Sequence, residues 1–207
     1  VMGNASPFNN IDVGLNSAPA LVDLDSDEDY DLVIGESDVT ILYFENTGTS
    51  MNPVFTGIGN GEGSGAGASN PFSGIDVGKN SKPTFVNFDG DDDLDLVVGG
   101  DDGKIMFFEN IGDSTTPLFT AERRHPFNGI DAGQNSAPTF INIDNDKDDD
   151  LIIGTSSGII RYFENIKTKS SFFTKRVGSD NPLNHIDVGD HSAPKFANFD
   201  GDADFDL

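Results

Sequence analysis

Short apolar runs, each bounded by turn-forming residues, recur along the chain and predict β-strands. In the first repeat described below, the runs cover about residues 20–22, 31–35, 40–45 and 54–56, and they are rich in β-branched and aromatic residues. Gly, Pro, Asn or Asp flank each run. No segment of about ten residues or more has apolar positions at helical spacing. The pattern therefore predicts an all-β protein.

The strand pattern belongs to a repeat of about 55 residues. The repeats open with PFNNIDVG, PFSGIDVG, PFNGIDAG and PLNHIDVG, whose first residues are 64, 55 and 56 positions apart. A Gly-rich insertion at 57–69 accounts for the longer first step. A four-stranded antiparallel unit of this length is typical of one blade of a β-propeller. The predicted blade units are 1–68, 69–124, 125–180 and a truncated fourth, 181–207.

The charge balance excludes several classes of function. The 36 acidic residues outnumber the 12 basic ones, which gives a formal charge of −24. Nucleic-acid binding needs a basic footprint, so we expect no nucleic-acid partner. The chain has no Cys, which excludes disulfides and Cys-ligated zinc. No apolar run approaches the roughly 18 residues of a membrane span, so we expect no membrane insertion.

A dense carboxylate run lies between the first two predicted strands of each repeat. The runs share the spacing D/N-x-D-x-D-x-x-x-D and begin at Asp23, Asn87, Asn142 and Asn198. In a tight turn, oxygens at positions 1, 3 and 5 converge, and a carbonyl at position 7 with a carboxylate at position 9 closes the shell. Such hard donors favour Ca²⁺ over Mg²⁺, and zinc lacks His or Cys partners here. A solvated acidic turn is the alternative, and four copies at one place in the repeat weaken it.

The order of these motifs is similar to that of the FG-GAP/VCBS repeat family, calcium-binding propeller blades also found at the head of integrin α chains. NPF, DVG, SAPTF, the acidic run and YFENTG follow one another as in the VCBS branch. The resemblance implies one Ca²⁺ per acidic loop, up to four in the chain. Positions 29, 93, 148 and 204 would act through their backbone carbonyls. The implied ligands are Asp23, Asp25, Asp27, Asp29 and Asp31; Asn87, Asp89, Asp91, Asp93 and Asp95; Asn142, Asp144, Asp146, Asp148 and Asp150; and Asn198, Asp200, Asp202, Asp204 and Asp206.

The sixth position of each loop departs from the family pattern, which usually has Gly there. This chain has Glu28, Asp92, Lys147 and Ala203. If the position requires a positive φ, a side chain costs about 1 kcal/mol. Lys147 also places a cation beside the third loop, so we expect that loop to bind calcium most weakly.

Two further groups of residues were considered as site candidates. Asp12, Asp76, Asp131 and Asp187 recur in I-D-V/A-G, where an Asp binds a ligand or closes a turn onto its own backbone. His125, His185 and His191 share no common spacing, and no Ser-His-Asp arrangement stands in a recognisable elbow. We therefore expect no enzymatic activity.

The resemblance and the calcium chemistry together imply an extracellular or cell-surface setting, where loops of millimolar affinity are filled. Two functions remain open. One is a structural, assembly or adhesion module that associates with itself or with neighbouring blades, either as a head-to-tail protomer of a fibril or as a piece of a larger surface protein. The alternative is a lectin-like propeller that binds a glycan or a protein. The absence of Trp and the placement of Phe and Tyr within strands favour the first.

Overall fold

The computed structural model describes residues 6–9, 11–38, 40–58, 70–121, 126–167, 172–198, 200–201 and 206–207. Most of the predicted insertion (59–69), His125, and Asp202, Ala203 and Asp204 of the fourth loop lie outside these residues. In the described part of the chain, no helix is long and apolar enough to cross a membrane.

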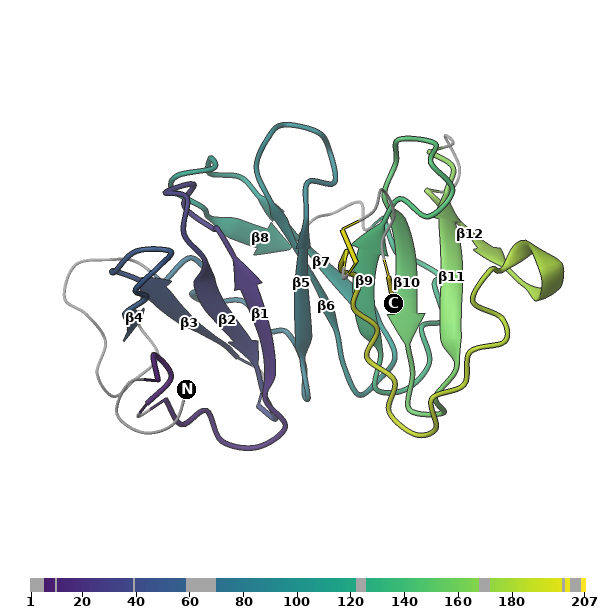
Figure 1. The fold of residues 1–207 in the computed structure, drawn as a ribbon, viewed down its shortest axis with the longest axis horizontal. Coiled ribbons are helices and arrows are strands. Elements are labelled where there is room, and N and C mark those ends of the chain that lie inside the picture. Colours follow the sequence, from purple (N-terminus) through teal and green to yellow (C-terminus); the bar gives the residue numbers. More distant parts are fainter. Residues whose placement is uncertain are drawn as a thin grey trace. The chain divides into compact units, whose positions relative to one another are not determined.

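The described residues form β-strands and one short 3₁₀ turn, Gly178–Asp180, so the predicted all-β class is confirmed. The strands make three four-stranded antiparallel sheets, in the orders β1-β2-β3-β4, β5-β6-β7-β8 and β12-β11-β10-β9 (Figure 1). The strand bounds are β1 Ala18–Val22, β2 Asp31–Gly35, β3 Ile41–Asn46, β4 Phe55–Gly57, β5 Lys82–Val86, β6 Asp95–Gly99, β7 Ile105–Asn110, β8 Phe119–Ala121, β9 Ala137–Ile141, β10 Asp150–Gly154, β11 Ile160–Asn165 and β12 Phe173–Arg176. The four strands predicted in the first repeat begin and end within about two residues of these bounds.

The chain divides into two compact units. The first comprises Val1–Val97 and Phe107–Arg123, and the second comprises Val98–Met106 and Arg124–Leu207. The first unit contains the whole β1–β4 sheet, and the second contains the whole β9–β12 sheet.

The second strand of each sheet is its most buried element. All five residues of β2, β6 and β10 are buried, with the sequences DLVIG, DLVVG and DLIIG. A strand covered on both faces needs a continuous apolar run rather than an alternating one, and β-branched residues pack well there. In the second unit, Ile152 of β10 packs with Ile141, Ile160, Tyr162 and Leu183 in one apolar cluster. These strands therefore hold each acidic loop against a rigid core.

Each of these central strands ends in a glycine against which a serine segment packs. Gly154 faces Ser192 and Pro194, and the Ser192 hydroxyl accepts a 2.7 Å hydrogen bond from the Thr155 amide. Ser192 also donates its own amide to the Thr155 carbonyl. The same approach joins Gly35 to Ser81 and Gly99 to Ser136. In the first repeat the equivalent serine, Ser17, is exposed.

The recurring PF turn packs an aromatic ring on the last strand of its repeat. Phe72 stacks on Phe119 with centroids 4.9 Å apart, and Phe127 stacks on Phe173 at 5.2 Å. Stacked rings at this distance stabilise the fold by about 0.5–1.5 kcal/mol beyond the effect of the apolar area that they bury. The turn is therefore part of the core of the repeat.

Candidate metal centre

The acidic loops lie between the first two strands of each sheet and reverse direction twice. Glu28, Asp92 and Lys147, at the sixth loop position, have φ values of 71°, 74° and 87°. The fourth loop position also has positive φ, at Ser26, Gly90 and Asn145. The sixth position therefore does require the left-handed backbone that the sequence analysis considered. The side chains present there carry the conformational cost that glycine avoids.

We expect Glu28→Gly to stabilise the protein by about 1 kcal/mol relative to Glu28→Ala. Both changes remove the same carboxylate, so their difference isolates the backbone at φ 71°. Urea unfolding of the two variants under the same calcium concentration provides the measurement. Equal midpoints, or an alanine variant that is the more stable, would contradict the strain assigned to this position.

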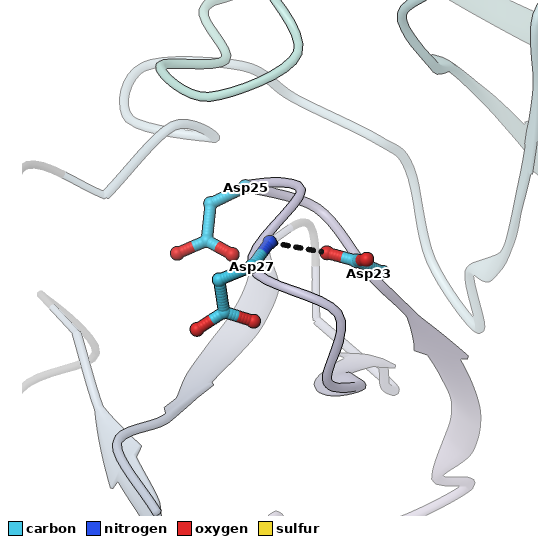
Figure 2. Close-up of side chains that lie close together, drawn as sticks. All are labelled: Asp23, Asp25 and Asp27. Atoms are coloured by element: carbon cyan, nitrogen blue, oxygen red, sulfur yellow. Dashed lines mark hydrogen bonds between the residues drawn. The ribbon is translucent and has the colours of Figure 1, made fainter. Parts of the chain in front are cut away.

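The first loop gathers three carboxylates around one point. One oxygen from each of Asp23, Asp25 and Asp27 lies within 4.8 Å of the other two, the only such cluster among the described residues (Figure 2). The Asp23 carboxylate accepts hydrogen bonds from the amides of Asp27 and Glu28, both at 3.2 Å. These bonds fix the turn, and the carboxylates of Asp25 and Asp27 lie on the same side of it (Figure 2). Like charges at this spacing repel unless a cation lies between them.

The clearest unsatisfied acceptors are at the seventh position. Asp29 and Asp93 are only 7 % and 6 % exposed, and Oδ1 of each carboxylate is buried without a hydrogen-bond partner. Burial raises the pKa of both carboxyls, and the neighbouring side-chain amides of Asn46 and Asn110 partly oppose that rise. Oδ1 of Asp25 is unpartnered in the same way. Buried acceptors are nearly always satisfied, and a bound cation would satisfy these.

The second and third loops share a local geometry with each other and, at the fifth position, with the first loop. In both, the carboxylates at the third and fifth positions accept hydrogen bonds from the amide two residues later, at 2.9–3.3 Å. The first position is an Asn in both loops, and Oδ1 of Asn142 is buried without a partner. The oxygens predicted at positions 1, 3 and 5 are thus held by one turn in each loop. The residues concerned are Asn87, Asp89, Asp91, Asn142, Asp144 and Asp146.

The ninth position performs a structural task that the sequence analysis did not include. Asp31, Asp95 and Asp150 are at most 2 % exposed, and Oδ1 of each accepts a hydrogen bond at 2.8–2.9 Å from the amide that ends the third strand. Oδ2 of Asp31 and Asp150 accepts from the hydroxyls of Tyr43 and Tyr162. The carboxylate predicted as a ligand therefore also ties the acidic loop to the third strand.

A signal for this contact exists in the sequence. The amide donors belong to the FEN motif, in which each Asn follows the ninth-position Asp by fifteen residues. A constant separation across three repeats is what a fixed contact between two strands requires. The donors are Asn46, Asn110 and Asn165.

Burial raises the pKa of Asp31, Asp95 and Asp150 to about 6, although hydrogen bonds from the chain favour the ionised form. A folded-state pKa above the unfolded value means that the folded chain takes up protons as the pH falls through 6. The free energy of unfolding of the metal-free protein should therefore increase as the pH falls from about 6 to about 4. The increase should be about 1–2 kcal/mol per carboxylate after allowance for solvent screening.

Calcium should reverse this pH dependence, because protons then compete with the metal for the carboxylates of the acidic loops. Thermal unfolding of metal-stripped and calcium-loaded protein from about pH 7.5 to about pH 5 measures both trends. We expect the midpoint of the metal-free protein to rise and that of the loaded protein to fall. If the midpoints of the metal-free and the calcium-loaded protein changed with pH in the same way, the calcium-binding role of the acidic loops would be contradicted.

The fourth loop is described only in part. The Asn198 side chain accepts a 2.6 Å hydrogen bond from the Gly201 amide, as Asn87 does from Gly90. Ala197 and Asp206 form an isolated antiparallel bridge, in the position that Ile141 and Asp150 occupy in the third sheet. The predicted ligands Asn198, Asp200 and Asp206 lie within the described residues, and Asp202 and Asp204 do not.

The recurring Asp of the I-D-V/A-G segment closes a turn. In all four repeats its Oδ1 accepts a hydrogen bond from the amide of the glycine two residues later, at 2.9–3.1 Å. This is the contact that the turn interpretation of these residues requires. The four residues are Asp12, Asp76, Asp131 and Asp187.

Comparison with models of known protein families, with curated proteins and with solved structures gave no match.

Proposed function

We propose that this chain is a calcium-stabilised, non-catalytic repeat module whose sheets are blades of a β-propeller. The observation that carries the proposal is the pair of buried, unpartnered Oδ1 atoms at the same position of two loops, Asp29 and Asp93. Positions 1, 3 and 5 would supply the other side-chain ligands, and the seventh position would add its carbonyl or this carboxylate. The ninth carboxylate would hold the loop in place from behind.

The donor set favours calcium among the common cations. Every predicted ligand is a carboxylate, amide or carbonyl oxygen, which suits a hard cation of flexible coordination. The bound ion would neutralise carboxylates that otherwise repel across the turn. It would also satisfy acceptors that the fold removes from water. Calcium would thus act on the stability of the loop and not on a reaction.

Calorimetric titration of the metal-stripped chain tests this proposal. We expect Ca²⁺ to bind at several sites and Mg²⁺ to bind much more weakly, because Mg²⁺ dehydrates reluctantly. The double variant Asp25→Asn/Asp89→Asn should lose the two sites of the first unit. Asp190→Asn makes the same charge change at an exposed residue outside the loops and should leave the titration unchanged. No heat of calcium binding, or equal loss in the control, would overturn the proposal.

The exposed serine segment of the first repeat supports a role in assembly. Ser81, Ser136 and Ser192 are at most 3 % exposed, whereas Ser17 and Pro19 are exposed and the side chain of Leu21 is 57 % exposed. In the other repeats this serine segment packs against the glycine that ends a central strand. In the first repeat the equivalent segment is exposed to solvent. We propose that it receives another blade of the same kind, from a second copy of the chain or from a neighbouring blade, in an extracellular or cell-surface setting.

Light scattering in about 2 mM Ca²⁺ and in excess chelator tests the assembly role. We expect a mass larger than one chain in calcium and a single-chain mass in chelator. Leu21→Asp should prevent the association, whereas Met51→Asp, at a side chain 85 % exposed in the turn between β3 and β4, should not. A single-chain mass under both conditions would contradict self-association of this chain.

A glycan-binding role has less support. The aromatic side chains that recur in the third strands are buried, as Tyr43, Phe107 and Tyr162 show with exposures of 6 %, 4 % and 3 %. Sugar recognition by stacking needs an exposed ring, which these positions do not provide.

A further inference from the structure

The three acidic loops that are described in full differ in the partner of the seventh-position carboxylate. Oδ1 of Asp29 and Oδ1 of Asp93 are buried without a partner. In the third loop, the side chain of Asp148 is 30 % exposed, and its Oδ1 instead accepts a 2.6 Å hydrogen bond from the ammonium group of Lys167. The acceptor that would need a metal in the first two loops already has a cation in the third.

Lys167 stands where the other two repeats have glycine. The segments FENTG, FENIG and FENIK align Gly48 and Gly112 with this lysine. A Cβ at Gly48 or at Gly112 would lie within 3.0 Å of a backbone oxygen of the following turn. Lys167, two residues after Asn165 at the end of β11, adopts a φ of 36°. The turns that follow β3 and β7 therefore have no space for a side chain at the position of Lys167.

The charge of the acidic loops also separates the third loop from the first two. The run 23–32 contains six acidic residues and no basic one, and 87–96 contains five and none. The run 142–151 contains five acidic residues and Lys147, and Lys167 brings a second cation to it. The third loop therefore gains less than the others from neutralisation by a bound metal.

We infer that Lys167 is a built-in counter-ion that holds the third acidic loop in place without metal, so that calcium controls the order of the first two loops and not that of the third. This inference rests on the proposed calcium function. Calcium withdrawal would then loosen the two acidic loops of the first compact unit while the third acidic loop, in the second unit, stays closed. Lys167 acts on the loop through Asp148, and it is a positioning residue.

Hydrogen exchange of the full chain, followed by mass spectrometry, resolves the loops separately. In the wild type, calcium should slow exchange in the loops at 23–31 and 87–95 by about tenfold or more, since an ion at about ten times its dissociation constant stabilises the closed loop by that factor. Calcium should change the loop at 142–150 little. In Lys167→Gln, the third loop should exchange faster in chelator and should recover when calcium is added.

Two controls separate charge from size and from position. Lys167→Arg keeps the cation and should behave as the wild type. Lys175→Gln removes an exposed lysine from β12 of the same unit and should leave the third loop unchanged. A third loop as calcium-dependent as the first two, or one unaffected by Lys167→Gln, would overturn this inference alone. A chain in which no loop responds to calcium would overturn the proposed function and this inference with it.

Discussion

Calcium should raise the thermal unfolding midpoint of this chain by about 5–20 °C. At about 5 mM, Ca²⁺ is at about 5 to 50 times a dissociation constant of about 10⁻³–10⁻⁴ M, which stabilises the folded state by about 1–2 kcal/mol per site. Two or three such sites add up to several kcal/mol, and each kcal/mol moves the midpoint of a chain of this size by about 2–4 °C. The unpartnered oxygens of Asp25, Asp29 and Asp93 are the groups that would gain the metal.

Scanning calorimetry of metal-stripped protein, with and without about 5 mM Ca²⁺, measures this rise. The same concentration of Mg²⁺ is the control, and it should give a much smaller change because Mg²⁺ prefers to retain its water. A midpoint that is the same in chelator and in calcium would show that the acidic loops are stable without a cation.

The second large effect is expected from Gly154→Ala. The added Cβ would lie 2.5 Å from Cδ of Pro194 and within 3.0 Å of the Ser192 carbonyl oxygen. Neither neighbour is the end of a flexible side chain, so the serine segment has to move away. Loss of this packing and of the hydrogen bonds between Thr155 and Ser192 should cost about 3 kcal/mol or more.

Gly57→Ala is the matched control for this substitution. An ideal Cβ at Gly57 would lie 3.4 Å from the Phe44 ring, an ordinary contact, and the second repeat has Ala121 at the same place. Urea unfolding should show a large loss for Gly154→Ala and a change of at most about 0.5 kcal/mol for Gly57→Ala. Similar losses in both variants would mean that the close approach to Ser192 does not determine the effect.

Much of the local structure could be predicted because the repeat reports it several times. The apolar run DLVIG and its two sibling runs fall on the buried strands β2, β6 and β10, as continuous apolar strands should. The concern about the sixth loop position was also justified, since Glu28, Asp92 and Lys147 all have positive φ. Both features depend only on neighbouring residues, which a single sequence displays directly.

The features that were not predicted depend on contacts between distant segments. The role of Asp31 in binding the amide of Asn46 connects residues fifteen positions apart and required the strand register to be known. The contact of Lys167 with Asp148 spans nineteen positions and occurs in one repeat only. Periodicity could not indicate it, because a change that breaks the repeat resembles neutral variation in the sequence.

The number of calcium ions bound per chain tests the central claim most directly. Metal-stripped protein is dialysed to equilibrium against about 2 mM Ca²⁺, and the bound metal is counted by atomic emission alongside the protein concentration. We predict at least two ions per chain, held by the loops at 23–31 and 87–95, with occupancy lost in Asp25→Asn/Asp89→Asn. A wild-type chain that binds fewer than one ion would contradict the account.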